Sequence, residues 1–336
     1  MLPSDLQKYD PNGMHNVYDR WPQIARDSYE SDLEAISCDG IDHIVFAGMG
    51  GSGAIGDLFS DLLSKSKIHV SLVKGYLLPK TVDKNTLVVI TSISGNSHEP
   101  LIVLETARRL DCSLIVFSSG GKIGNFCSKN NCEFRNIPMI HSPRSSFVKY
   151  VYSMLKILRP ILPISKNEVD ESLVQLNKVC DVISSANISE TNSALNLARW
   201  ISGIPLIYYP HGLQSSAVRF KSSLQENAKA HAMIEDVIEA CHNGIVAWEK
   251  QSSVQPILLR GHDDYIKTKE RWEIIKKYFE ENNIDFREVK SSEGNILTKL
   301  MSLIYLLDYT SIYKAILNKT DPSPVKSIDY IKKKLI

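Results

Sequence analysis

The sequence has little of what marks several large classes of protein. Its 336 residues carry a formal net charge of only +1, which gives no sign of a surface for nucleic acid or for anionic membranes. No run approaches the ~18 consecutive apolar residues that a membrane-spanning helix needs. The first thirteen residues are polar and lack the charged-then-apolar plan of a secretory signal. These absences favour a cytoplasmic protein with neither nucleic acid nor membrane among its partners.

The cysteines are few, and their spacing indicates no special chemistry. None of the six forms a C-x-x-C pair, and most fall in expected helices or strands, where a reduced, buried thiol is the expected state. Cys127, Cys132 and His141 fit no standard spacing of zinc ligands. The sequence therefore predicts free thiols and no metal site.

What the sequence does contain is a regular alternation of short apolar runs and helical segments. Apolar runs that predict strands lie at 44–47, 68–73, 86–91, 113–117 and 133–137, and again at 204–209, 256–260 and 286–289. Strands that alternate with helices of about 10–15 residues indicate parallel sheets with helices on both faces. The predicted fold class is α/β, with two such three-layer domains, and the chain is long enough for both.

The helical segments and the prolines divide the chain. Helices are expected at 22–36, from near 53, and at 98–110, 145–158, 166–185, 190–202, 264–281 and 296–317, whereas residues 1–20 are expected to be irregular. Pro160 and Pro163 predict a linker at about 159–165, so that residues 1–158 hold the first domain and residues 166–336 the second, which ends in a C-terminal helix. Because the second half repeats the plan of strand, small-residue loop and helix, we interpret the chain as a duplicated α/β unit.

The first candidate site follows the first strand. Four glycines and a serine stand within six residues: Gly48, Gly50, Gly51, Ser52 and Gly53. Glycines let the backbone approach a ligand closely, and the first turn of a helix presents unpaired N–H groups, so the loop is typical of an anion site. It also matches the dinucleotide pattern G-x-G-x-x-G, but Lys74 follows the second strand where an acidic residue should bind a ribose. We favour a smaller phosphate ligand over a nucleotide or a merely tight turn.

The second candidate site follows the strand at 86–91. Ser92, Ser94, Asn96 and Ser97 offer neutral hydrogen-bond donors just before a helix, which is typical of a second phosphate-binding loop. The simpler alternative is a helix N-cap made by Ser97 with Asn96. A cap needs one such residue rather than four, so the phosphate-binding interpretation is preferred.

Five segments carry a resemblance to a known family. SISGNS at 92–97 resembles the S-x-S-G-N-[ST] signature of the sugar isomerase (SIS) domain. Together with GMGGSGAIGD at 48–57 it resembles the archaeal-type bifunctional phosphoglucose/phosphomannose isomerase family. RFKSSLQENAK at 219–229, EACHN at 239–243 and DPSPVKSIDYIK at 321–332 extend the match over nearly the whole chain in the family's order.

The resemblance implies a fold and an activity. It implies two SIS domains and a homodimer, with the active site near the domain and subunit interfaces. It also implies aldose–ketose isomerisation of hexose 6-phosphates through a cis-enediol, without metal or organic cofactor. Gly51, Ser52, Ser92, Ser94 and Ser97 match the phosphate-binding positions.

The same resemblance assigns four catalytic residues. Glu226 is implied to be the base that moves a proton between C1 and C2, because proton abstraction next to a carbonyl needs one carboxylate on one face of the substrate. His242 is implied to assist ring opening and to reach the neighbouring subunit's site. Arg144 would stabilise negative charge on the enediolate, and Lys332 would approach the substrate. Without the family, these residues would be interpreted as a solvated helical glutamate, a partly buried histidine, an interdomain salt bridge and a solvated tail.

Three positions depart from the family pattern. His231 stands where a proline often follows the ENAK segment, Cys241 replaces an asparagine, and Gly244 replaces the acidic residue beside the histidine.

Two other functions stay open at this point. One is a non-catalytic sugar-phosphate-binding SIS regulator, although the chain has no helix-turn-helix arm and no basic stripe. The other is an isomerase of amino-sugar phosphates or of ketose phosphates of another chain length.

Overall fold

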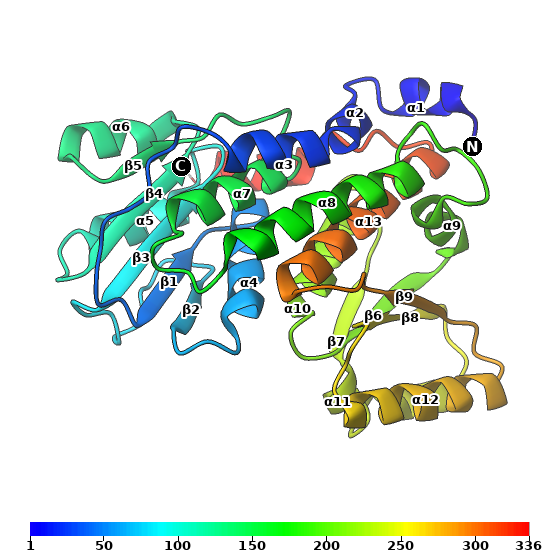
Figure 1. Ribbon diagram of the computed structural model, residues 1–336. Helices are drawn as coiled ribbons and strands as arrows, with labels where there is room; N and C mark the ends of the chain where they lie inside the picture. The colour runs from blue at the N-terminus through cyan, green and yellow to red at the C-terminus, as the bar shows by residue number, and fades with distance from the viewer. Residues whose placement is uncertain (336) are drawn as a thin grey trace. The chain divides into compact units, whose positions relative to one another are not determined.

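The computed structural model describes residues 1–335 and contains two parallel β-sheets with helices packed against them (Figure 1). The first sheet has the strand order β2-β1-β3-β4-β5, and the second has the order β7-β6-β8-β9. The strands are β1 (His43–Ala47), β2 (His69–Val73), β3 (Thr86–Ser92), β4 (Ser113–Ser118), β5 (Phe134–Asn136), β6 (Ile204–Tyr209), β7 (Met233–Asp236), β8 (Val254–Arg260) and β9 (Arg287–Lys290). Every pairing is parallel, which confirms the predicted α/β class.

The helices follow the predicted alternation with the strands. They are α1 (Pro3–Tyr9), α2 (Met14–Asp19), α3 (Trp21–Tyr29), α4 (Gly51–Leu63), α5 (His98–Ala107), α6 (Gly121–Asn130), α7 (Phe147–Ile157), α8 (Lys166–Ile183), α9 (Ser193–Trp200), α10 (Gln214–Asn227), α11 (Val237–Ala240), α12 (Ile266–Glu281), α13 (Ile296–Leu317) and α14 (Lys326–Lys334). A 3-10 helix, η1, spans Gly244–Glu249. Helix α4 packs against β1, β2 and β3, and helix α10 packs against β6 and β7.

Contacts within the chain define two compact units. The first-sheet unit comprises Arg20–Val174 and Gly294–Leu300, and the second-sheet unit comprises Met1–Asp19, Gln175–Glu293 and the residues from Met301 onward. The two sheets fall on the predicted sides of the 159–165 linker, whose position stays a prediction. The grouping also assigns the N-terminal residues to the second-sheet unit, which sequence spacing does not indicate.

The N-terminal segment corrects the sequence prediction of an irregular lead-in, because it forms α1 and α2. Pro3 stands in the first turn of α1, where its missing N–H costs nothing. The Asp10 carboxylate accepts hydrogen bonds from Met14 N (3.0 Å) and His15 N (2.7 Å) and so holds the start of α2. Helices of one or two turns depend on such individual contacts and show little periodicity.

Other boundaries also differ from the prediction. Helix α3 ends at Tyr29 instead of near residue 36. Ile36 N instead donates to Ile157 O (2.9 Å), at the C-terminal end of α7. Strand β7 and helices α6 and α11 were not predicted, because short elements with mixed burial lack a clear apolar pattern. The predicted helix over 296–317 is confirmed as α13.

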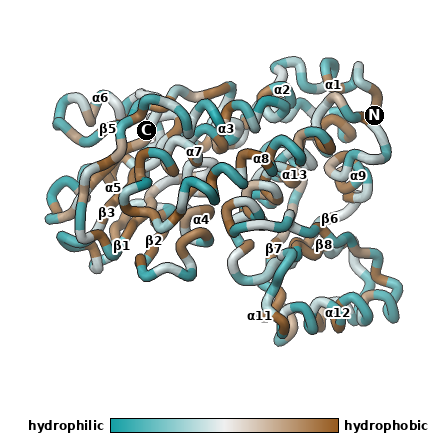
Figure 2. The backbone as a smooth tube through the Cα atoms, viewed as in Figure 1, coloured by the Kyte–Doolittle hydropathy of each residue, from teal (hydrophilic) through white to brown (hydrophobic). Residues whose placement is uncertain are grey.

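The cores lie along the central strands. Every residue of β1 and β3 is buried, and Figure 2 shows the hydrophobic colour along these strands. In the second-sheet unit, Tyr208 and Leu258 of the sheet share a buried cluster with Trp272 of α12. Helix α13 is long and apolar enough to cross a membrane by length and composition, but 83% of its apolar window is buried. That burial is expected of a core helix in a folded domain.

Candidate active site

The glycine-rich loop after β1 approaches the backbone of Arg144. A Cβ atom at Gly51 would lie 3.3 Å from Arg144 Cα and 3.5 Å from Arg144 N, so the absence of a side chain lets the two segments meet. Gly50 has φ +53°, which favours glycine at the residue before α4. Arg144 is buried, being 5% exposed. Two predicted site residues from distant parts of the sequence are thus brought together in the first-sheet unit.

Ser52 links this loop to the second one. Its Oγ accepts a hydrogen bond from Ile93 N (3.1 Å), and the residue is buried. The hydroxyl proton of Ser52 can still be donated to another acceptor. Ser52 therefore has a positioning contact in addition to the phosphate contact that the sequence predicts.

The second loop, residues 92–97, is not a plain helix cap. Ser97 occupies the N-cap position of α5, yet its side chain makes no capping hydrogen bond. Ser92 Oγ is buried and has no hydrogen-bond partner among residues 1–335. Ser94 Oγ accepts from Asn96 N at 3.4 Å, a long contact. A buried hydroxyl without a partner is unfavourable, so its retention points to a ligand contact.

A third loop, residues 118–121 after β4, was missed by the sequence analysis. Ser119 Oγ donates to Ile93 O (2.6 Å), and Lys122 N donates to Asn96 Oδ1 (3.2 Å). Gly95 has φ +68°, and a Cβ there would collide with the Gly120 carbonyl. The third loop therefore fixes the second. Its sequence, SSGG directly after a buried strand, is the same kind of signal that identified the first two loops.

Lys74 also has a defined contact. Its Nζ lies 2.6 Å from Asp57 Oδ1 and 2.7 Å from Asp57 Oδ2, which joins the end of β2 to helix α4. Lys74 stands where a dinucleotide site would have an acidic residue, and here it stabilises helix α4, which follows the glycine-rich loop. The Asp57 side chain is largely buried, whereas that of Lys74 is 42% exposed.

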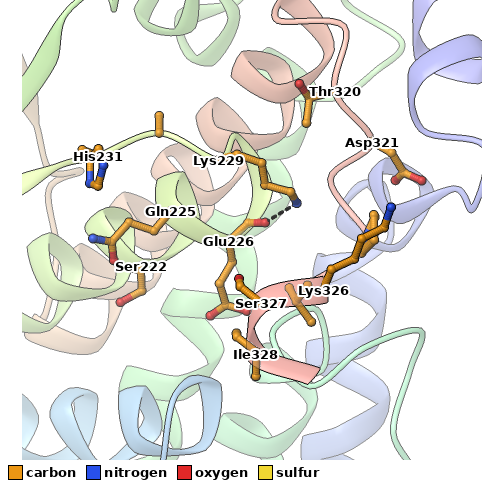
Figure 3. Close-up of a pocket in the computed structure, with 13 residues that line it drawn as sticks. Ser222, Gln225, Glu226, Lys229, His231, Thr320, Asp321, Lys326, Ser327 and Ile328 are labelled. Carbon is orange, nitrogen blue, oxygen red and sulfur yellow. Dashed lines mark hydrogen bonds between the residues drawn. The ribbon is translucent and has the colours of Figure 1, made fainter. Parts of the chain in front are cut away.

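In the second-sheet unit, Glu226 lines a cleft of about 890 Å³. The cleft lies between the C-terminal part of α10 and the segment leading into α14 (Figure 3). Its polar lining comprises Ser222, Gln225, Glu226, Lys229, His231, Thr320, Asp321, Lys326 and Ser327. Figure 3 shows the Glu226 side chain pointing toward Ser327 and Ile328. The predicted base thus stands at a cavity and not on a fully solvated face.

The bonds of α10 to α13 explain how the helix that carries Glu226 is held. Arg219 Nε donates to Asp308 Oδ2 (3.0 Å), Ser223 Oγ donates to Asp308 Oδ1 (2.6 Å), and Asn227 Nδ2 donates to Ser311 Oγ (2.8 Å). These residues are four apart, so they share one helix face, which is bonded to α13. Burial raises the pKa of Asp308 above its ordinary value, and the Arg219 guanidinium opposes that shift.

Lys229 connects the end of α10 to the C-terminal segment. It adopts φ +55°, and its Nζ donates to Glu226 O (2.6 Å) and Pro322 O (3.2 Å). Asp321 Oδ1 accepts from Ser323 N (2.8 Å) in the same segment. The ENAK and DP motifs therefore meet in space, although nearly a hundred residues separate them in sequence.

The C-terminal lysines behave differently from the prediction. Lys332 is exposed on α14 and does not line the cleft, whereas Lys326, at the start of that helix, does. No residue of α14 is buried. The role of Lys332 stays a prediction, and the cleft-lining residues Ser222, His231, Thr320 and Lys326 were not identified from the sequence as site residues.

His242 stands on an exposed turn after α11 and does not line this cleft either. The turn is held by His242 N donating to Glu239 O (2.9 Å) and by Asn243 Nδ2 donating to Glu239 Oε1 (3.0 Å). Its role likewise stays a prediction. Among residues 1–335, no group of three or more His, Cys, Asp or Glu side chains has the arrangement of a metal site.

Comparison with known proteins gives these features a context. Residues 190–335 match the family described as the bacterial phospho-glucose isomerase C-terminal SIS domain. A protein of Caldicellulosiruptor bescii named bifunctional phosphoglucose/phosphomannose isomerase is 31% identical over 312 residues, covering 89% of this chain and 91% of the relative. The chain belongs to the bifunctional phosphoglucose/phosphomannose isomerase family. This membership confirms the resemblance inferred from the sequence motifs.

The phosphoglucose/phosphomannose isomerase family has near relatives with other names. A D-glucosamine-6-phosphate 4-epimerase of Sulfolobus acidocaldarius is 28% identical over 249 residues, covering 73% of this chain and 77% of the relative. A hypothetical protein of Thermus thermophilus has a crystal structure that superimposes with a TM-score of 0.76 at 14% identity, covering 99% of this chain and 92% of that one. The latter likeness supports the fold.

Proposed function

We propose that this protein interconverts glucose 6-phosphate and mannose 6-phosphate with fructose 6-phosphate through a cis-enediol. The observation that carries the proposal is the position of Glu226, which lines a polar cleft in a chain that belongs to the phosphoglucose/phosphomannose isomerase family. Because Ser223 and Asn227 bond α10 to α13, the carboxylate is held by a fixed helix, as a proton-transfer group must be.

In this mechanism Glu226 takes the proton from C2 of the aldose and returns it to C1, and the reverse reaction uses the same carboxylate. One base serves both carbons because they are adjacent and the enediol is planar between them. Arg144 stabilises the negative charge that develops on the enediolate oxygens. His242 assists opening of the sugar ring, and Lys332 approaches the substrate.

The phosphate is proposed to bind at the loops after β1 and β3. Gly51, Ser52, Ser92, Ser94 and Ser97 offer backbone N–H groups and hydroxyls there, at the starts of α4 and α5. A helix N-terminus favours an anion through its unpaired N–H groups and its dipole. Ser92 Oγ, buried without a partner among residues 1–335, supports this assignment.

We further propose that the enzyme is a homodimer with shared active sites and is cytoplasmic. The exposed position of His242, outside the lining of the Glu226 cleft, is compatible with a contribution to the neighbouring subunit. The reaction needs no metal or organic cofactor in this proposal.

The first test follows fructose 6-phosphate by NMR with purified protein and excess chelator. Formation of both glucose 6-phosphate and mannose 6-phosphate is expected. Glucose 6-phosphate alone would restrict the enzyme to phosphoglucose isomerisation and direct attention to His231 and Gly244. Tight binding without conversion would instead support the regulator.

The substitution Glu226→Gln tests the base. It keeps the size of the side chain and removes proton transfer, so kcat should fall by about 10²–10⁴-fold with little change in substrate affinity. Glu280→Gln, an exposed carboxylate on α12, is the matched control and should keep wild-type turnover. Turnover at the wild-type rate in Glu226→Gln would remove Glu226 from the mechanism.

A second candidate is an isomerase or epimerase of amino-sugar phosphates. The relative named D-glucosamine-6-phosphate 4-epimerase favours including it. The same NMR experiment with glucosamine 6-phosphate distinguishes the two, because conversion of that sugar without conversion of fructose 6-phosphate would select this candidate.

A further inference from the structure

Two cysteines meet at the C-terminal end of helix α6. The helix closes with Asn131 in the left-handed conformation (φ +50°), and Cys132 N donates to Cys127 O (3.2 Å). In a helix end of this kind, the side chains of the two residues joined by that hydrogen bond commonly pack together. Here both of those residues are cysteines, and both are free thiols.

The two thiols are in contact. Burial, and then electrostatic interaction and hydrogen bonding with the Cys132 thiol, raise the pKa of the Cys127 thiol to about 12. Cys132 also packs against the buried cluster that contains Cys127. A disulfide needs Cα atoms within about 4.4–6.8 Å of each other, and residues joined by a backbone hydrogen bond are neighbours of that kind. The pair is therefore placed for a disulfide.

The two thiols differ in their access to solvent. Cys127 is 1% exposed, whereas Cys132 is only half-buried. The Arg108 guanidinium lies at the same helix end, where its Nη1 donates to Asn130 Oδ1 (2.9 Å), and its charge favours the thiolate of Cys127. A dissolved reagent can thus reach Cys132 first, while Cys127 is protected from the reagent but adjacent to Cys132.

We propose that Cys127 and Cys132 form a reversible disulfide when the protein meets a low-molecular-weight disulfide such as oxidised glutathione. The Cys132 thiolate attacks one sulfur of the reagent, whose S–S bond breaks and releases one glutathione thiolate. Cys127 then loses its proton and attacks the Cys132 sulfur of the mixed disulfide, which releases the second glutathione thiolate. The two protein thiols are oxidised, and their two protons and two electrons leave with two molecules of reduced glutathione.

The disulfide joins the end of α6 to the segment that leads into β5, where Val116 N donates to Glu133 O (2.9 Å). Disulfides in reducing compartments are typically transient and sense oxidants, so the dithiol is the resting form and the disulfide is a response to oxidant. Neither cysteine lines the Glu226 cleft, and the inference does not depend on the proposed function.

Peptide mapping tests the pair directly, because Lys129 separates the two cysteines in sequence. After incubation with oxidised glutathione, the protein is unfolded, alkylated and cut with trypsin, which yields residues 123–129 with Cys127 and residues 130–135 with Cys132. These two peptides should be recovered joined, and dithiothreitol should separate them. Cys112, in the peptide of residues 110–122, should be recovered alkylated and serves as the control.

Single variants test the order of attack. In Cys127→Ala, Cys132 should keep glutathione as a stable mixed disulfide. In Cys132→Ala, the buried Cys127 should react with oxidised glutathione about 10-fold or more slowly than Cys132 does in the wild type. Cys112→Ala should form the Cys127–Cys132 disulfide at the wild-type rate.

Two results would overturn the proposal in a protein with native circular dichroism. One is that both thiols of the wild type stay free in oxidised glutathione while a small model thiol is oxidised. The other is that the reaction stops at glutathione bound to Cys132, because Cys127 then fails to attack it. Neither result bears on the conversion of sugar phosphates, so the failure of this inference is distinct from the failure of the proposed function.

Discussion

At the scale of single residues, the polar groups after β1, β3 and β4 divide into two sets. Ser52, Asn96 and Ser119 bond to neighbouring loops and hold them together. The buried Ser92 hydroxyl has no hydrogen-bond partner among residues 1–335, and the Ser97 side chain makes no capping hydrogen bond to α5. The composition of the sequence identifies the loops after β1 and β3. It does not show which of their residues bond to another loop, because those bonds depend on the 118–121 loop, which follows a different strand.

This division predicts opposite effects for two similar substitutions. Ser92→Ala removes a buried hydroxyl without a partner, so the free energy of unfolding should stay the same or rise, while KM for sugar phosphates rises about 10-fold. Ser119→Ala breaks a hydrogen bond to Ile93 O and should lower the free energy of unfolding by about 1 kcal/mol. Urea denaturation together with steady-state kinetics measures both. Similar losses of stability in the two variants would contradict the division.

The buried histidine of β1 predicts a pH dependence of stability. Burial, and then the neighbouring His69, lower the pKa of His43, whose ring also contacts Ser71 Oγ (2.9 Å) and Thr86 Oγ1 (3.2 Å). The unfolded chain therefore binds this proton more readily, and stability falls as the pH drops below the ordinary value of about 6.5.

This loss of stability should develop as the pH falls from about 7 to 5. Urea midpoints of wild type and His43→Gln across that range should show a shallower dependence in the variant. His211→Gln, which alters an exposed histidine, should keep the wild-type slope. Parallel slopes for all three proteins would remove His43 as the cause.

At the scale of elements, the sequence predicts long regular segments well and short ones poorly. Helix α13 begins and ends where its apolar pattern predicts, and β3 is a fully buried run. Strand β7 and helix α11, by contrast, consist of four residues each and are defined by pairing and capping contacts. The candidate site shows the same limit. The ENAK and DP motifs can be recognised in the sequence. Only the folded structure shows that Lys229 bonds to both of them.

The attachment of α10 to α13 gives the prediction at this scale. Asp308→Asn should lower the free energy of unfolding by about 3–5 kcal/mol, because it removes the carboxylate charge that faces the buried Arg219 guanidinium. Asp170→Asn breaks the exposed pair with Lys166 and should cost at most about 0.5 kcal/mol. Urea denaturation compares them directly. Equal, small effects would mean that this buried pair does not hold the helix.

At the scale of the whole molecule, two sheets of the same plan share one chain, as the alternation of strands and helices predicts. Composition and periodicity are enough to predict the two sheets, because buried parallel strands appear in the sequence as short apolar runs. They do not assign the N-terminal helices to a unit, since α1 and α2 depend on specific contacts such as those between Asp10 and His15. The assembly of the molecule remains a proposal that experiment can decide.

Complementation between inactive variants tests the shared active site. If His242 serves the neighbouring subunit and Glu226 its own, mixed dimers of Glu226→Gln and His242→Ala each contain one intact site. Equal mixing after subunit exchange should then restore about a quarter of wild-type activity, given that about half of the dimers are mixed. Sedimentation confirms the dimer, and a mixture as inactive as its parents would place both residues in one subunit's site.

The separate roles of the α10 residues also have a consequence for evolution. Arg219, Ser223 and Asn227 attach the helix, whereas Ser222, Gln225 and Glu226 line the cleft, and no residue belongs to both sets. A lineage could therefore exchange the residues of the cleft without weakening the fold. Proteins with this framework would then be expected to diverge in reaction sooner than in architecture, as the different names of this chain's relatives suggest.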